Sequence, residues 1–391
     1  MMSFRIQYVT ALLILGTLFF SGEKAQANEN SAWRTFRNGP RNQGVSSIAV
    51  KSLVTEIPRE TPKDTLRDIR EFSTGGLIWA TPVIDHEDNV FFGAANKNFY
   101  RIDKFGNQIW MYTLFDRPDS LIDSAAALLT HDGKKLTIVP GGDGFLHTLD
   151  QETGELQWFF RSDGATDADH DSGKVVNSFE GNVQIGPNGM IYAGSDNGYI
   201  YAIDPNGVVE NHQMMKELWR FRTGNKHAKK PKDMVWSSPV FGSTHETHWM
   251  AFGGLDGNIY LLDPLSGNEL SRYGAGGTVK SSPAVDEDRN IYFGTANGKL
   301  ISLRVDKKGQ GLQLNRRWEF DTHGEIYSSP AVKGNRIVFG SLDGYLYCLD
   351  SQGKLSWKFG TYSQFGISRN VFVTIFMWMI WLELILMAFA I

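Results

Sequence analysis

The sequence predicts an all-β protein. We expect a β-propeller of four-stranded antiparallel blades, with six recognisable repeats, an incomplete seventh, and an apolar helix at the C-terminus. Three observations support this prediction: a short segment that recurs along the chain, a constant spacing inside each copy, and the lack of any helical periodicity between residues 33 and 359.

The recurring segment is the expected start of each blade. It reads "WATPVI" at 79–84, "WSSPVF" at 236–241, "KSSPAV" at 280–285 and "YSSPAV" at 327–332. Two further copies have degenerate openings, "DSAAALL" at 123–129 and "EGNVQI" at 180–185. Small residues suit an innermost strand, where blades crowd together around the axis. Proline is tolerated at the first residue of a strand, because no ladder donor is lost there.

A constant spacing follows in each copy. In five copies, seven residues separate the Asp or Asn of a tight turn from the acidic residue that ends the third strand: Asn96 to Asp103, Asp143 to Asp150, Asn197 to Asp204, Asp256 to Asp263, and Asp343 to Asp350. The copy that contains Asn297 has Arg304 instead. Alternating apolar residues between Asp-Gly or Asn-Gly turns predict four short strands. Four such strands about every ~45 residues are typical of propeller blades.

The fourth strand of most copies carries a tryptophan. These residues are Trp110, Trp158, Trp219, Trp318 and Trp357. We expect each indole to pack across to the next blade, which favours a structural role over a ligand site.

With this pattern the chain resembles the β-propellers built from pyrroloquinoline quinone (PQQ)-like repeats. The opening "WRTFRNGPRNQGVS" (33–46) is also similar to that family, and the resemblance covers about residues 33–366. The family includes quinone-dependent alcohol and sugar dehydrogenases. It also includes non-catalytic scaffolds such as the outer-membrane assembly lipoprotein of the β-barrel assembly machinery. The chain lacks the adjacent cysteine pair of the large dehydrogenases, so it resembles the scaffold members more closely.

The N-terminus predicts export. Arg5, the apolar run 9–20 and the "AQA" at 25–27 form a secretory signal peptide over residues 1–27. Residues 28–69 are then a lead-in segment and irregular loop, and residues 70–366 the propeller. We therefore expect a periplasmic or extracellular protein.

The C-terminal residues 367–391 form an apolar tail. Segment 371–391 has one charge, Glu383, and is long enough for a helix that spans a bilayer. Three interpretations stay open: a membrane anchor that tethers the exported protein, an out-of-frame or truncated end of a chain whose seventh blade is missing, and a helix buried in the protein.

Few residues suggest chemistry. A net charge of −4 without a basic aromatic cluster argues against nucleic acid. No catalytic residue is predicted, and none can be matched to the quinone ligands of the dehydrogenases. The alternating Asp167, Asp169 and Asp171 are candidate Ca²⁺ ligands, although a solvated loop is the simpler interpretation. Otherwise no cofactor is expected.

The residue three positions before the proline changes from copy to copy. It is Trp79, Trp236, Lys280 or Tyr327, with Ile122 at the same count in the second copy. Such a ring of aromatic and cationic side chains suits a partner peptide or a flat ligand. The alternative is that these side chains only fill the axial funnel.

The sequence therefore favours an exported, non-catalytic propeller that binds a protein or peptide partner. The alternative is a quinoprotein alcohol or sugar dehydrogenase that uses PQQ and Ca²⁺. That alternative requires acidic and amide groups at one rim of the propeller.

Overall fold

A computed structural model describes residues 72–116, 120–162, 178–209, 214–224, 233–244 and 247–360 of the chain. All of its regular structure in these ranges consists of 24 β-strands, which confirms the predicted all-β class. The predicted signal peptide, the predicted lead-in segment and the apolar tail lie outside the described residues. So do Asp167, Asp169 and Asp171. In the described part of the chain, no helix is long and apolar enough to cross a membrane.

The first three blades come from the N-terminal half of the described chain. Blade 1 contains β1 (Val83–Ile84), β2 (Val90–Gly93), β3 (Asn98–Ile102) and β4 (Gln108–Thr113). Blade 2 contains β5 (Ala127–His131), β6 (Lys134–Pro140), β7 (Phe145–Asp150) and β8 (Leu156–Arg161). Blade 3 contains β9 (Gln184–Ile185), β10 (Ile191–Gly194), β11 (Tyr199–Val209) and β12 (Met214–Arg222).

The other three blades complete the described arc. Blade 4 contains β13 (Val240–Thr244), β14 (Thr247–Gly253), β15 (Asn258–Leu262) and β16 (Glu269–Gly274). Blade 5 contains β17 (Ala284–Val285), β18 (Asn290–Gly294), β19 (Lys299–Lys308) and β20 (Gly311–Asp321). Blade 6 contains β21 (Ala331–Lys333), β22 (Arg336–Gly340), β23 (Tyr345–Leu349) and β24 (Leu355–Gly360).

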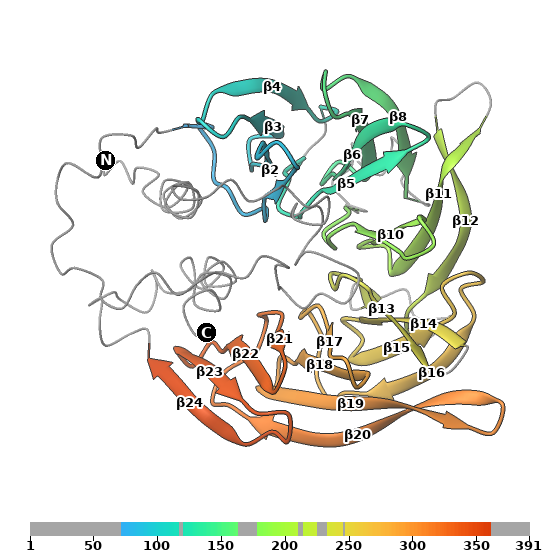
Figure 1. Ribbon diagram of the computed structural model, residues 1–391, viewed down its shortest axis with the longest axis vertical. Coiled ribbons are helices and arrows are strands. Elements are labelled where there is room, and N and C mark those ends of the chain that lie inside the picture. Colours follow the sequence, from blue (N-terminus) through green and yellow to red (C-terminus); the bar gives the residue numbers. More distant parts are fainter. Residues whose placement is uncertain are drawn as a thin grey trace, which may run out of the picture.

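The blades are arranged around a common centre (Figure 1), with the first strand of each blade innermost and the fourth outermost. Within each blade, consecutive strands pair antiparallel, as the repeat predicted. Blades 2 and 3 are also joined, because β8 pairs with β12 in parallel through Phe159 and Met214, and the two blades form one eight-stranded sheet.

The second strand ends in a glycine because the next blade packs too closely for any side chain at that position. A Cβ on Gly253 would overlap Val279, and a Cβ on Gly294 would overlap Ile326. Val279 and Ile326 each stand directly before the variable residue of the next blade and are fully buried. The repeated Phe-Gly pair therefore lets each blade lie close against the next one.

The serines of the recurring segment connect the blades around the axis. The main-chain N–H of Ser238 donates to Ser282 Oγ at 2.9 Å, and the N–H of Ser282 donates to Ser329 Oγ at 2.9 Å. Asn182 continues this connection to earlier blades, because its side-chain nitrogen donates to Ser238 Oγ at 2.9 Å and its oxygen accepts from Ala125 N at 2.6 Å. We call this chain of hydrogen bonds, from Ala125 to Ser329, the axial belt.

Three of the predicted tryptophans bind the next blade in one way. Trp110, Trp219 and Trp318 donate from Nε1 to the main-chain oxygens of Gln151, Pro264 and Ser351, at 3.0, 3.1 and 3.0 Å. In each case the ring covers a glycine in the same turn, where a side chain would collide with the indole. The predicted packing across blades is confirmed for these three tryptophans.

Trp158 differs from these three. Its indole nitrogen is buried without a hydrogen-bond partner among the described residues. In the next blade, the glycine turn between the third and fourth strands is replaced by the long hairpin of β11 and β12. The interaction therefore depends on a turn that blade 3 lacks.

Candidate functional site

The strongest candidate site is a ring of side chains at the start of the blades. In every blade one residue lies four positions before the innermost strand. The residue before it is buried, and in blades 2 to 6 the N–H of that preceding residue donates to the second-strand turn of the previous blade. The residues in this position are Trp79, Asp123, Glu180, Trp236, Lys280 and Tyr327. We call these six residues the axial rim.

The register of blade 2 corrects one sequence assignment. Counting from the degenerate opening placed Ile122 in the ring, but Ile122 is buried and donates from its N–H to Ala94 O at 3.3 Å. Val279 makes the equivalent bond to Gly254 O at 3.2 Å. Ile122 is therefore the counterpart of Val279, and the rim residue of blade 2 is Asp123. The error arose because blade 2 has no proline from which to count.

One half of the axial rim is aromatic and cationic. The Lys280 ammonium nitrogen lies 4.7 Å from the centre of the Trp236 ring and 4.3 Å from the centre of the Tyr327 ring. These three predicted residues, from blades 4, 5 and 6, thus meet at one point. The structure does not show a contact of this group with Trp79, which is 37% exposed.

The side of the rim on blades 2 and 3 is acidic. Asp123 and Glu180 belong to the rim, and Asp196 reaches it from the second-strand turn of blade 3. The carboxyl groups of Glu180 and Asp196 lie close enough to affect each other's ionisation, and Asp196 accepts a 2.7 Å hydrogen bond from the indole nitrogen of Trp236. Burial and the neighbouring charges of Asp196 and Asp123 raise the pKa of Glu180 to about 8. Burial is also the main cause that raises the pKa of Asp196 to about 7 and that of Asp123 to about 6. The pKa of Glu180 is thus raised furthest, so its carboxyl keeps a proton to a higher pH than Asp123 or Asp196.

Sequence reasoning missed these three carboxylates, although the sequence contains a signal. Asp123 and Glu180 begin the two degenerate openings. Asp196 stands in the turn after the second strand, where the other copies have Ala95, Gly142, Leu255, Ala296 and Leu342. The positions that depart from the repeat therefore indicate the site, because the residues shared by all copies hold the blades together.

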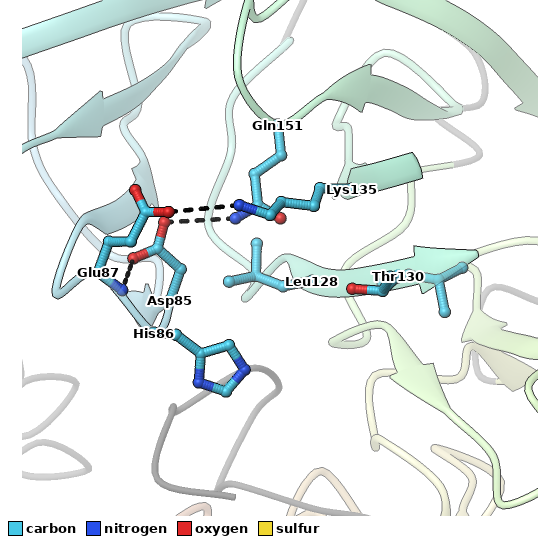
Figure 2. Close-up of a pocket in the computed structure, with 8 residues that line it drawn as sticks. Asp85, His86, Glu87, Leu128, Thr130, Lys135 and Gln151 are labelled. Carbon is cyan, nitrogen blue, oxygen red and sulfur yellow. Dashed lines mark hydrogen bonds and ion pairs between the residues drawn. The ribbon is translucent and has the colours of Figure 1, made fainter. Parts of the chain in front are cut away.

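A second polar cluster lies between blades 1 and 2, around a small pocket of about 40 Å³. Figure 2 shows the side chains of Lys135 and Gln151 pointing from blade 2 toward Glu87 and Asp85 of blade 1. Lys135 Nζ is 3.3 Å from Glu87 Oε1, and Gln151 Nε2 donates to Asp85 Oδ2 at 3.3 Å.

Arg101 completes this cluster and is only 3% exposed. Its Nη1 donates to Gln151 O at 2.8 Å and pairs with Glu152 Oε2 at 2.9 Å. Its Nη2 lies 3.5 Å from Asp85 Oδ2. The charged groups around the pocket are thus paired with one another, and we interpret the cluster as a clasp between blades.

No group of three or more His, Cys, Asp or Glu residues in the described ranges has the arrangement of a metal site. The predicted Ca²⁺ ligands Asp167, Asp169 and Asp171 are outside those ranges, so that prediction is untested.

Comparison with known proteins agrees with the geometry. The family model for outer membrane protein assembly factor BamB matches residues 255–374. Within this range, less than half of the chain, the sequence is similar to the PQQ-like repeats of that family. The solved structure of BamB from Moraxella catarrhalis is similar to this propeller, with 15% identity, a TM-score of 0.55, and coverage of 75% of this chain and 79% of that one.

An enzyme of the same fold is almost equally similar. A europium-containing methanol dehydrogenase has 15% identity and a TM-score of 0.53, with coverage of 70% of the propeller chain and 67% of that one. The beta-alanine-activating enzyme of Danio rerio is 28% identical over 114 residues, which are 28% of this chain and 9% of that protein. The match thus spans a small part of that curated relative. These likenesses establish the fold of the propeller.

Proposed function

We propose that this chain is an exported, non-catalytic β-propeller that holds a protein or peptide partner at its axial rim. The observation that carries this proposal is the contrast between rim and belt. The serines and asparagine of the axial belt bond neighbouring blades to one another, whereas the six rim positions carry Trp, Asp, Glu, Trp, Lys and Tyr.

The rim has the features of a recognition surface. Aromatic and cationic side chains dominate the binding energy of protein interfaces, and Trp236, Lys280 and Tyr327 form such a group. Carboxylates on blades 2 and 3 give the opposite side of the ring a different charge, which favours one orientation of the partner. Similarity to BamB supports a scaffold, since that protein is described as an assembly factor.

Crosslinking from the rim tests this proposal. The full chain would be produced in its source cells with a photoreactive phenylalanine analogue at Trp79, and in a matched variant at Phe105, an exposed residue of a peripheral turn. We expect a discrete crosslinked partner from the Trp79 position, lost when Lys280→Glu is added, and none from Phe105. Equal crosslinking from both positions would reject the rim as the binding surface.

A quinoprotein dehydrogenase is the second candidate, because the rim contains the acidic and amide groups that this alternative required. Asp123, Glu180 and Asp196 supply carboxylates, and Asn182 supplies an amide. However, both ends of the Asn182 amide are already hydrogen-bonded within the belt. PQQ is itself a polycarboxylate, and Lys280 is the one cationic member of the rim. These described residues do not fit the bound quinone well.

Reconstitution decides between the candidates. The full chain would be incubated with PQQ and Ca²⁺, and alcohol- or sugar-dependent reduction of a dye would be followed. Turnover that is lost in Glu180→Gln would establish the dehydrogenase and reject the scaffold. No turnover, together with rim-dependent crosslinking, is the result expected from the scaffold.

A further inference from the structure

The side chains of the rim form a connected path across four blades. Asp196 of blade 3 accepts a hydrogen bond from the indole nitrogen of Trp236 in blade 4, and the Trp236 ring contacts the ammonium group of Lys280 in blade 5. The Glu180 carboxyl, also of blade 3, interacts with the charge of Asp196. Lys280 in turn contacts the ring of Tyr327 in blade 6. A change at the carboxyl pair therefore has a direct route to Lys280 and the aromatic groups.

The position of Lys280 is the key observation. Its ammonium group lies over two ring faces, and within the described residues no ion pair joins Lys280 to a carboxylate. An ammonium group is strongly hydrated and is carried on a flexible four-carbon stem, so it follows the local balance of charge. A nearby extra negative charge can match the cation–π attraction that holds the ammonium group over the rings.

We propose that the axial rim is a proton-operated switch, in which Lys280 moves between the ring faces of Trp236 and Tyr327 and the carboxylates of blade 3. With Glu180 protonated, Lys280 remains between the rings. When Glu180 releases its proton to solvent, the ammonium group moves toward Glu180 and Asp196, and the aromatic faces become available to a partner.

The charges around Lys280 support its movement toward Glu180 and Asp196 when Glu180 loses its proton. The groups that face the path are Asp123 from blade 2, Glu180 and Asp196 from blade 3, Lys280 from blade 5, and Glu325 with Tyr327 from blade 6. Burial, followed by repulsion from the carboxylates of Asp196 and Asp123, raises the pKa of Glu180 to about 8, and Lys280 opposes this shift. Ionisation of Glu180 leaves three carboxylates close together with Lys280 as the rim's counter-charge.

Tyr327 stays neutral throughout this range. Burial and a hydrogen bond to Glu325 raise its pKa to about 12. Its ring therefore keeps the same electronic character on both sides of the transition, and only the Lys280 position changes. The switch itself can be tested without a partner; its use in controlling partner binding rests on the proposed function.

Fluorine NMR of the full chain tests the switch. The protein would be labelled with 5-fluorotryptophan, and the Trp236 signal assigned by its loss in Trp236→Phe. We expect this signal to titrate between about pH 6 and about pH 9, the range in which a carboxyl with a strongly raised pKa ionises. Trp318, which is bonded to Ser351 in a distant part of the ring, should give a constant signal.

Two variants separate the switch from a simple titration next to an indole. In Lys280→Met the Trp236 titration should shrink severalfold, whereas Lys280→Arg, which keeps the charge, should retain it. Glu180→Gln should remove the step that belongs to Glu180 and leave only the step of Asp196 at lower pH. Asp196→Asn is the second variant if Glu180→Gln does not fold. A constant Trp236 signal, or an equal titration in Lys280→Met, would overturn the proposal. Absence of a crosslinked partner would count against the proposed function and leave this titration unaffected.

Discussion

The indole nitrogen of Trp318 donates a 3.0 Å hydrogen bond to the main-chain oxygen of Ser351 in the next blade. Trp158 occupies the corresponding strand of blade 2, but its nitrogen has no partner among the described residues. Comparison of the two residues therefore distinguishes the contribution of the indole hydrogen bond to stability from the contribution of ring packing.

Replacement of each tryptophan by phenylalanine measures this difference. Trp318→Phe should lower the free energy of unfolding by about 1 kcal/mol more than Trp158→Phe, because only the former loses a hydrogen bond between blades. Urea unfolding followed by circular dichroism gives both values. Equal losses would show that the indole nitrogen contributes nothing to blade packing.

Removal of one hydroxyl from the axial belt should also destabilise the fold. Ser282→Ala leaves the buried N–H of Ser238 without its acceptor, which should cost about 1–3 kcal/mol. Ser266→Ala, in an exposed turn, should stay within about 0.5 kcal/mol of the parent. A Ser282→Ala protein as stable as the control would mean that the belt is dispensable.

The clasp between blades 1 and 2 predicts a large effect for its arginine. Arg101→Met leaves Asp85 and Glu152 without their buried cation and should cost about 3–5 kcal/mol. Arg272→Met is the matched control, because that side chain is 48% exposed and its ion pair with Glu269 should be worth at most about 1 kcal/mol. Thermal unfolding of the two variants compares them, and similar melting temperatures would contradict the assignment.

The rim carboxylates predict how stability depends on pH. The pKa values of Asp123, Asp196 and Glu180 are raised to about 6, 7 and 8, so the folded chain holds protons that the unfolded chain has already released. Their contribution is fully present below the unfolded pKa values and is lost as pH rises through this range. The free energy of unfolding should therefore fall between about pH 5 and about pH 8.

Glu180→Gln provides the comparison for this pH dependence. An amide cannot release a proton, so the fall in stability should be smaller in the variant, which should be the more stable protein at the alkaline end. Denaturant midpoints measured across the range test this. Parallel pH profiles of the parent and the variant would mean that Glu180 ionises normally.

The frame of this protein could be predicted from sequence because each blade repeats the same contacts. Gly253 and Gly294 meet the same kind of neighbour, and Ser238 and Ser282 make the same bond, so recurrence itself indicates structural necessity. Four rim residues, Trp79, Trp236, Lys280 and Tyr327, could be found for the same reason, by counting from a repeated proline.

The acidic half of the site could not be found in this way. Asp123 and Glu180 belong to blades that lack the proline, so counting failed by one residue at Ile122. Asp196 reaches the rim from a different turn, and its contact with Trp236 joins residues 40 positions apart. The role of Asp196 could not be predicted, because it requires knowing that this turn of blade 3 lies beside the first residues of blade 4. Only the folded structure shows this.

The parallel pairing of Phe159 with Met214 makes blades 2 and 3 one sheet. Amide hydrogens in these two blades should consequently exchange with solvent as a single cooperative unit, slower than those of blade 4. Asp123 and Glu180 both extend from this fused sheet. The acidic part of the rim is therefore carried by one continuous sheet, whereas the aromatic part is carried by blades 4, 5 and 6, each of which forms its own four-stranded sheet.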